Sequence, residues 1–482
     1  MVTPEVTPFV KEGGMADVVG ALPLALREQG HDVRVICPRH GSLQIRENWQ
    51  RREDILFVPT GEGTRYASVW ETSLDAKSRV PLYFIEYEEF FARGEIYHGP
   101  WGAHGDNDRR FAFFSRAALE TCNLLEWIPD VIHCHDWTTG LVPVYLNTLY
   151  RGGEWSRTAS VFTIHNLEHQ GNFSAEVMPF TQLPGWVYQE AGLESLGRMN
   201  WMKGAIYHAN KITTVSPTYA NEIRTPEGGF GLDHALRFKG GDLIGILNGI
   251  DPHFWNPERD PLTGHTYSAD DFSGKDALKA SLQSDFGLEV NPHLPVFGVV
   301  SRLFHQKGLD LLASVVERIA ESGRMQLIVL GAGEKWEEES FSHAAARHPT
   351  SVGAHIGFSE ALAHRIIAGS DFFVMPSRFE PCGLGQQYAM RYGTIPVVRQ
   401  TGGLADTVVS VGQHDATGFL FTEAHPHQLL ESLFEAVTLW EYAPDEIHRL
   451  RINGMNRDAS WDRSAEQYTE VYEWAVQARR GA

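Results

Sequence analysis

Two cations directly follow a predicted strand in the second half of the chain. The apolar run at residues 296–300 (VFGVV) has the length and composition of a buried parallel strand, and residues 301–308 (SRLFHQKG) come after it. Open α/β sheets bind ligands outside the carboxyl ends of their strands, which places Arg302 and Lys307 at a ligand site. Two cations there suit a diphosphate leaving group, whose negative charge grows as the bond to it breaks. A surface turn with solvated cations explains this segment equally well on its own.

A carboxylate and a glycine-rich turn follow another predicted strand, at residues 372–375 (FFVM). Glu380 lies beyond the end of this strand, where a carboxylate can accept hydrogen bonds from sugar hydroxyls. The Gly-Leu-Gly backbone at residues 383–385 opens the next predicted helix and can hold phosphate oxygens. We expect Cys382 to pack rather than react, because no neighbouring group marks it as an activated nucleophile. A purely structural turn is the alternative interpretation.

Two glycines near the start of the chain, Gly13 and Gly14, precede a helical pattern that ends near Gly30. Glycine lets the backbone turn so that amide groups at the helix N-terminus face an anion, and Lys11 adds a mobile positive charge there. The residue order of a P-loop is absent. Taken alone, a plain helix entry with a solvated lysine is the favoured interpretation.

The segment HCHD combines four metal-binding residue types at the end of a predicted strand. Successive side chains of a strand point to opposite faces, so His133 and His135 share one face. Cys134 and Asp136 share the other, which is a poor arrangement for a tetrahedral metal. We expect these side chains, like residues 165–166 (HN), to face a ligand cleft instead.

Two further motifs have simpler interpretations. Asp106 and Asp108 form an Asp-x-Asp segment of the kind that binds metals, but a helix is predicted at residues 109–124, so we expect helix capping. The Gly-Ala-Gly segment at residues 331–333 follows a strand, yet Trp336 stands where a dinucleotide fingerprint has glycine. These motifs therefore predict neither a metal site nor an NAD site.

Short β-rich runs alternate with longer helical patterns, which predicts an α/β fold of parallel sheets covered on both faces. Further strands are expected at residues 32–37, 81–85, 130–133, 159–164, 211–215, 326–330 and 395–398, and a helix at 309–321. We expect two doubly wound, Rossmann-like domains, residues 1–245 and 246–460, with a hinge near 246–256 and a ligand cleft between them. The amphipathic tail at residues 461–482 is expected to form a helix that packs back on the first domain.

The composition excludes several classes of protein. The chain has 482 residues, 43% apolar and 21% charged, as in globular proteins with more than one domain. A net charge of -20 argues against nonspecific binding to nucleic acid or anionic membranes. No apolar run reaches the roughly 18 residues of a transmembrane helix, and no secretory signal opens the sequence, so we expect a cytoplasmic protein. The 4 scattered cysteines suit free thiols in a reducing compartment.

The order of these segments along the chain resembles that of bacterial glycogen synthases and plant starch synthases. The matching stretches span nearly the whole chain: KEGG at 11–14, HDW at 135–137, HN at 165–166, NGID at 248–251, SR and KG within 301–308, EPCGL at 380–384 and TGGLAD at 401–406. No motif is decisive alone, but their combined order is highly specific to this family.

This resemblance implies the two-domain GT-B architecture and a retaining glucosyltransferase that uses ADP-glucose without a metal or a cofactor. The acceptor would be glycogen or a maltooligosaccharide. By position, the implied catalytic residues are Asp136, His165, Arg302, Lys307 and Glu380. The implied substrate-binding residues are Lys11, Gly14, Asn166, Asn248, Cys382, Gly383, Leu384 and Gly385. Among these residues, Lys11, Arg302 and Lys307 would bind the donor diphosphate, and His165 would lie beside the anomeric carbon.

Three departures from the family pattern stand out. Tyr388 occupies the place where the wider superfamily often has a second glutamate, which removes one expected ribose ligand. Gly385 stands where relatives often carry a hydroxyl residue, which would loosen a phosphate contact. The family normally has a β-strand before the equivalent of Val2, so we expect Met1 to be an internal methionine, with translation starting upstream.

Other functions are compatible with parts of the sequence. A related GT-B enzyme with another acceptor, such as sucrose, would share these motifs. A catalytically silent glucan-binding protein would have lost its phosphate ligands, yet Lys11, Arg302, Lys307 and Glu380 are all present. A pyridoxal-dependent phosphorylase has a similar architecture, but no lysine is marked as a Schiff base. The preference for ADP-glucose over UDP-glucose rests on the resemblance alone, and the oligomeric state is not predicted.

Overall fold

The computed structural model describes residues 1–77, 79–99 and 101–481. The chain forms two compact units: unit 1 comprises Met1–Gly249 and Trp461–Ala482, and unit 2 comprises Ile250–Ser460. The chain first crosses from unit 1 to unit 2 between Gly249 and Ile250, which lie within the segment predicted as a hinge. The last residue of the predicted tail, Ala482, lies outside the described residues.

Unit 2 contains one parallel sheet with the strand order β17-β16-β15-β18-β19-β20. The strands are β15 (Val296–Val300), β16 (Gln326–Gly331), β17 (Val352–Ile356), β18 (Phe372–Met375), β19 (Ile395–Arg399) and β20 (Phe419–Phe421). In this doubly wound order, the winding of the chain reverses between β15 and β18. The predicted strands β15, β16, β18 and β19 are confirmed. β17 and β20 were not predicted, because neither carries a long apolar run.

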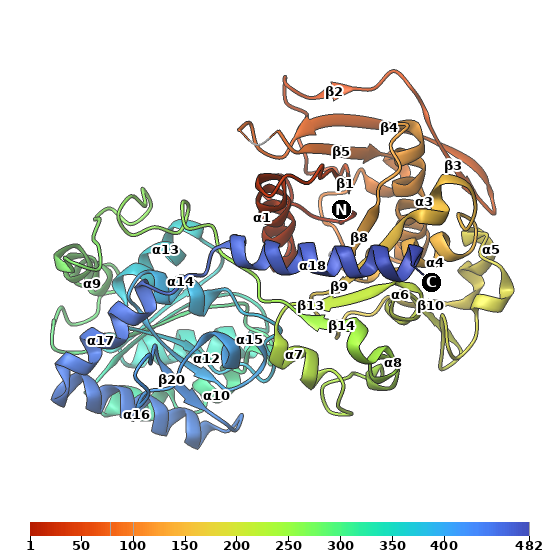
Figure 1. The fold of residues 1–482 in the computed structure, drawn as a ribbon. Coiled ribbons are helices and arrows are strands. Elements are labelled where there is room, and N and C mark those ends of the chain that lie inside the picture. The colour runs from red at the N-terminus through yellow and green to blue at the C-terminus, as the bar shows by residue number, and fades with distance from the viewer. Residues whose placement is uncertain (78, 100, 482) are drawn as a thin grey trace. The chain divides into compact units, whose positions relative to one another are not determined.

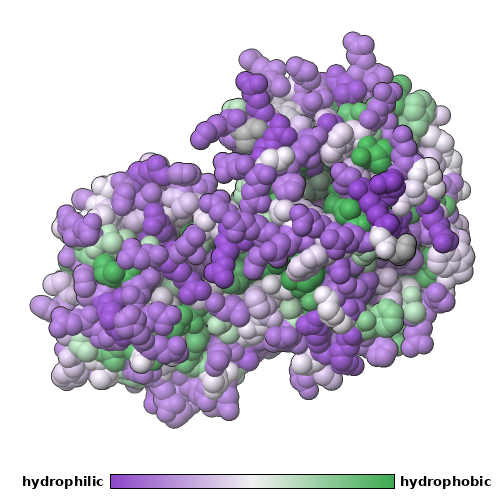
Figure 2. Space-filling model, viewed as in Figure 1, coloured by the Kyte–Doolittle hydropathy of each residue, from purple (hydrophilic) through white to green (hydrophobic). Residues whose placement is uncertain are grey.

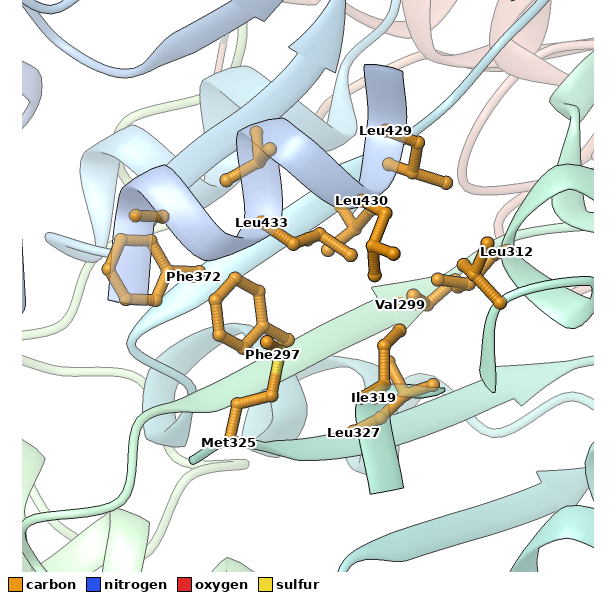
Figure 3. Close-up of a cluster of buried hydrophobic side chains, with 14 of the residues drawn as sticks. Phe297, Val299, Leu312, Ile319, Met325, Leu327, Phe372, Leu429, Leu430 and Leu433 are labelled. Atoms are coloured by element: carbon orange, nitrogen blue, oxygen red, sulfur yellow. The ribbon is translucent and has the colours of Figure 1, made fainter. Parts of the chain in front are cut away.

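A hydrophobic core fixes β15 and β18 side by side (Figure 3). The rings of Phe297 and Phe372 stack at a centroid distance of 4.7 Å, with 16° between their planes. Leu429 and Leu433 of α16 (Pro426–Tyr442) belong to the same buried cluster. The loops that leave the carboxyl ends of β15 and β18 therefore start from rigid, neighbouring strands.

Helices cover the sheet of unit 2, and one of them differs from its prediction. The helix predicted at residues 309–321 is split into α10 (Leu309–Ala313) and α11 (Val316–Glu321). At the break, the hydroxyl of Ser314 and the amide of Val315 each donate to the carbonyl three residues earlier, which tightens the turn. The apolar periodicity continues across this break, so it gave no signal. The other helices are α9 (Ser273–Asp285), α12 (Lys335–Arg347), α13 (Glu360–Gly369), α14 (Gly385–Arg391), α15 (Gly402–Thr407) and α17 (Pro444–Met455).

Unit 1 contains a parallel sheet, β14-β13-β9-β8, and a mixed sheet, β1-β5-β4-β2, with β3 paired to β4. Val2 connects the two through parallel bridges to Cys134 and Ile36. The strands are β1 (Val35–Pro38), β2 (Gln50–Arg51), β3 (Leu56–Thr60), β4 (Gly63–Ser73), β5 (Pro81–Glu86), β8 (Val131–His135), β9 (Ala159–Ile164), β13 (Lys211–Thr214) and β14 (Leu243–Gly245). The strands predicted in this part of the chain are confirmed, although β1 begins at Val35 rather than at Asp32.

The C-terminal helix α18 (Trp461–Arg480) packs on unit 1, which confirms the predicted return of the tail. It contacts α1 (Gly14–Glu28) and β9 (Figure 1). Its Tyr468 and Val471 share a buried cluster with Leu22 of α1. The other helices of this unit include α3 (Asn107–Leu124), α4 (Leu141–Asn147), α6 (Trp201–His208), α7 (Pro217–Glu222) and α8 (Asp233–Lys239).

Hydrophilic residues dominate the face of the molecule shown in Figure 2. All 4 cysteines are buried and free, which confirms the prediction of free thiols. Within the part of the chain that the structure describes, no helix is both long and apolar enough to cross a bilayer.

Candidate active site

In unit 2, the predicted cation Lys307 pairs with the predicted carboxylate Glu380. The Nζ atom of Lys307 lies 2.9 Å from Oε1 and 2.7 Å from Oε2 of Glu380. Lys307 ends a short 3-10 turn and is followed by Gly308, whose φ is 65°. A Cβ atom at Gly308 would lie 2.1 Å from the carbonyl oxygen of Pro376, so only glycine lets the loops after β15 and β18 approach this closely. The pair therefore forms where the winding of the sheet reverses, the usual ligand position in such folds.

Glu380 is held rigidly by its neighbours. Its side chain is buried, and Ser377 Oγ donates a hydrogen bond of 2.9 Å to Oε2. Its carbonyl oxygen accepts a hydrogen bond of 3.0 Å from the amide of Gly403. The Thr-Gly-Gly segment singled out in the sequence thus supports the backbone of Glu380. This arrangement keeps the carboxylate in one position before any substrate binds.

Replacing Gly402 with alanine should disrupt this support. Gly402 has a φ of 45°, and a Cβ atom there would lie 1.9 Å from the carbonyl oxygen of Glu380. We expect G402A to lower the free energy of unfolding by about 3 kcal/mol, because backbone must move to relieve the overlap. The matched control is Gly323→Ala: Gly323 has a φ of 62° but no atom within 4 Å of a new Cβ, so its cost is about 1 kcal/mol. Equal costs in urea denaturation of the two variants would contradict this role of Gly402.

Arg302 differs from Lys307 in its surroundings. Its side chain is exposed, and its guanidinium carbon lies 5.8 Å from the ring centroid of Phe304. Among residues 1–77, 79–99 and 101–481, no carboxylate lies within ion-pair distance of Arg302. Its charge is therefore available to an anionic ligand, whereas that of Lys307 is shared with Glu380.

The backbone segment predicted to hold the donor follows Glu380 directly. Cys382 is buried, as expected for a packing residue, and Gly383 has a φ of 72°. Leu384 is the residue before α14, and Gly385 is its first residue. A Cβ atom at Gly385 would lie 2.9 Å from the ring of Phe373, which gives the glycine at this position a structural reason. The ring of Phe373 takes the space.

Tyr388, the other departure from the family pattern, lies in a stack of rings. Its ring stacks on Trp255 at 3.7 Å, and Trp255 stacks in turn on His364 at 4.0 Å. The Nδ1 atom of His364 lies 2.7 Å from Asp260 Oδ2. A glutamate at position 388 would lose this stacking, so the tyrosine has a structural reason here.

In unit 1, Asp136 and His165 follow the adjacent strands β8 and β9, and the structure brings them together. Asp136 Oδ1 accepts a hydrogen bond of 2.8 Å from the backbone amide of His165. Asp136 has a φ of 54°, a left-handed conformation that is uncommon for a residue other than glycine. Burial raises the pKa of Asp136 to about 8, although the amides of His165 and Asn166 oppose this. A strained, half-buried carboxyl at a strand end is typical of functional sites.

Sequence reasoning missed two residues of this region, Glu5 and Tyr97. Glu5 Oε2 accepts hydrogen bonds from the amides of Glu12, at 2.5 Å, and Gly13, at 2.9 Å. The hydroxyl of Tyr97 donates to Glu5 Oε1 at 3.1 Å. Burial raises the pKa of Glu5 to about 7, and the charge of Glu5 contributes to the raised pKa of Asp136. In this structure, the amides of the glycine turn therefore donate to the chain's own carboxylate, Glu5.

The remaining predicted residues of unit 1 occupy varied positions. Lys11 is exposed and lies 2.8 Å from Asp17 Oδ1. Gly14 is the first residue of α1, and Asn248 is buried near the end of the unit. The side-chain oxygen of Asn166 accepts a hydrogen bond of 3.0 Å from the amide of Glu168.

The Asp-x-Asp segment does not cap its helix in the expected way. Asp106 occupies the capping position of α3, but its side chain makes no capping hydrogen bond. Both of its oxygens instead accept hydrogen bonds of 2.6 Å from Arg93, a bidentate partner that outcompetes the helix amides. In the described ranges, no three histidine, cysteine, aspartate or glutamate side chains are grouped as metal ligands.

The chain is similar in sequence to starch synthases and glycogen synthases. Residues 1–238 match the family described as the starch synthase catalytic domain, and residues 283–455 match the one described as glycosyl transferases group 1. Glycogen synthase 1 of Geobacter sulfurreducens is 44% identical over 491 residues, which covers 100% of this chain and 97% of that relative. The glycogen synthase of Treponema denticola is 40% identical over 486 residues, which covers 99% of this chain and 98% of the relative.

Solved structures give the same result at the level of the fold. The catalytic domain of starch synthase IV from Arabidopsis thaliana, bound to ADP and acarbose, is 35% identical with a TM-score of 0.91. The match covers 99% of this chain and 98% of that domain, which confirms the predicted GT-B fold class. A sucrose-phosphate synthase from Thermosynechococcus elongatus, 16% identical with a TM-score of 0.59, shares the fold alone.

Proposed function

Because the chain belongs to the glycogen synthase and starch synthase family of glycosyltransferases, we propose that it transfers glucose from ADP-glucose to an α-1,4-glucan. The acceptor is the non-reducing end of glycogen or of a maltooligosaccharide in the cytoplasm, and ADP is released. The observation that supports this most strongly is the Lys307–Glu380 pair at the winding reversal of unit 2, with the exposed Arg302 on the same loop.

Unit 2 supplies the donor-binding residues in this proposal. The ADP bound to the starch synthase IV domain supports an adenine nucleotide as the donor. Arg302 and Lys307 neutralise the diphosphate as the glycosidic bond breaks, and electrostatic stabilisation of this kind is often the largest catalytic term. The backbone of residues 383–385 holds phosphate oxygens. Glu380, which shares Lys307, accepts hydrogen bonds from the glucose hydroxyls.

Unit 1 supplies the residues around the transferred sugar. The acceptor 4-hydroxyl attacks from the same face as the departing phosphate, which takes the proton, so the anomeric configuration is retained. Asp136 as a carboxylate stabilises positive charge near the anomeric carbon, and His165 and Asn248 lie beside the sugar. Glu5 and Tyr97 share a hydrogen bond, and both interact electrostatically with Asp136. They therefore also belong to the residues proposed to surround the transferred sugar.

A donor and acceptor screen tests this proposal. ADP release is measured in a coupled assay with ADP-glucose or UDP-glucose, each with glycogen, maltotriose or sucrose as the acceptor. We expect release from ADP-glucose only when a glucan is present. Release with sucrose alone would indicate a different acceptor class, and no release from either donor would contradict the proposed reaction.

A further inference from the structure

Three histidines lie in a row in unit 1, beside Asp136; His133 and His135 are buried, and His165 is half-buried. His133 and His135 lie on the same face of β8, with ring centroids 4.2 Å apart. His135 Nδ1 lies 3.0 Å from Nε2 of His165, so one hydrogen bond, with one shared hydrogen atom, links these two rings. His165 follows β9, and the pairing of β8 with β9 sets this contact. His165 has a role in the proposed reaction, whereas His135 has none so far.

The surroundings of His135 restrict which nitrogen carries its proton. His135 is fully buried, and its Nε2 atom has no hydrogen-bond partner among the described residues. If His165 donated the shared hydrogen, a neutral His135 would carry its own proton on Nε2, as a buried N–H group without an acceptor. Buried N–H groups without acceptors are rarer in proteins than under-satisfied acceptors. The favoured state therefore has the proton on His135 Nδ1, donating to His165.

Protonation of both rings would remove this choice, but burial disfavours it. Desolvation lowers the pKa of His135 well below its ordinary value and that of His165 to about 3. Both rings are neutral at pH 7, and each carries one N–H group. With its Nε2 acting as an acceptor, His165 carries its proton on Nδ1. The Nδ1 atom makes no hydrogen bond to any described residue, and His165 is only half-buried, so this N–H group can reach a ligand.

We infer that His135 is a positioning residue that fixes His165 as its Nδ1–H tautomer, so that His165 offers a hydrogen-bond donor to an oxygen of the substrate. The chemical class recognised is a sugar hydroxyl or glycosidic oxygen acting as an acceptor. The identity of that substrate rests on the proposed function, whereas the tautomer belongs to the protein alone.

The chain offers a matched set of variants. His135→Phe removes the donor while filling the space, and His135→Asn restores an amide N–H near the position of Nδ1. His133→Phe is the control, because His133 is equally buried on the same face but bonds to Tyr472 and Thr163 rather than to His165.

The primary measurement is the nitrogen-15 NMR spectrum of histidine-labelled full-length protein without substrate, with the His165 signals assigned by His165→Gln. We expect a protonated Nδ1 and an unprotonated Nε2 for His165 in the wild type, H133F and H135N, and a shift toward Nε2–H in H135F. A wild-type His165 protonated on Nε2, or an unchanged tautomer in H135F, would overturn the inference.

Kinetics provide the second readout. H135F should lower kcat roughly fivefold to tenfold with little change in KM, as expected for the loss of one positioning hydrogen bond, and H135N should recover most of it. An H135F variant with the shifted tautomer but an unchanged kcat would refute the positioning role. If the wild type releases no ADP while the NMR pattern holds, the proposed function fails and the tautomer assignment stands.

Discussion

Replacing Lys307 with alanine should lower the turnover number about 10²-fold or more, the usual effect of losing one electrostatic stabiliser of a leaving group. Lys307 lies in the loop after β15, with its Nζ atom 2.7 Å from Glu380 Oε2, so the substitution also removes the cation from the carboxylate that we propose contacts the sugar. Initial rates of ADP release at saturating ADP-glucose measure this effect. Lys307→Arg, which keeps the charge, should retain more activity than K307A. An unchanged kcat in K307A would remove Lys307 from the mechanism.

The same substitution should affect stability in a way that a surface lysine does not. The Glu380 side chain is 6% exposed, so K307A leaves a buried carboxylate without its cation. Breaking a buried ion pair on one side costs roughly 3 kcal/mol, measurable by urea denaturation. Lys335→Ala is the control, because the Lys335 side chain is 87% exposed in its ion pair with Glu339 and should contribute little. Equal stability of the two variants would show that Glu380 does not depend on Lys307.

The second large effect on activity is expected at Asp136. Burial raises the pKa of this residue to about 8. If the ionised carboxylate stabilises positive charge on the sugar, kcat/KM should rise with pH and level off above pH 8. Asp136→Asn should abolish this rise and lower kcat about 10²-fold. The control Asp130→Asn alters a side chain that is 80% exposed and should leave the pH profile unchanged. The range from about pH 6.5 to 9 spans the Asp136 pKa of about 8. A wild-type profile of kcat/KM that is flat across this range would contradict the assigned role.

The ionisation of Asp136 should make the folded protein less stable as the pH rises, whereas it should make the enzyme more active. The folded-state pKa of Asp136 lies above its ordinary value, so the folded protein holds the proton more tightly than the unfolded chain. The resulting stabilisation is complete below the unfolded pKa and is lost as the pH rises through about 8. D136N has no such proton. Its free energy of unfolding should therefore fall less than that of the wild type between about pH 7 and 9, a range centred on the Asp136 pKa of about 8. A parallel decline in both proteins would contradict the raised pKa.

Much of unit 2 could be predicted from the sequence because its strands are continuous apolar runs. Residues 296–300 and 372–375 have no polar interruption, and burial on both faces of a parallel sheet produces that pattern. Chemistry-bearing residues directly after such runs must lie at one edge of the sheet. Lys307 and Glu380 each follow one of these runs, and the structure shows them in contact.

Contacts that depend on distant segments could not be predicted in this way. The hydrogen bond between Tyr97 and Glu5 joins residues 92 positions apart, and no local pattern marks either side chain. The bidentate contact of Asp106 with Arg93 displaced the expected cap for the same reason. Likewise, only the packed structure shows that the ring of Phe373 occupies the space beside Gly385.

A crystal structure of the protein with ADP and a maltooligosaccharide would test the central claim most directly. We predict that the diphosphate lies within hydrogen-bonding distance of the Arg302 guanidinium and the Lys307 ammonium group, with the glucan near Asp136. A nucleotide bound elsewhere, with Arg302 and Lys307 both facing solvent, would contradict the proposed enzyme.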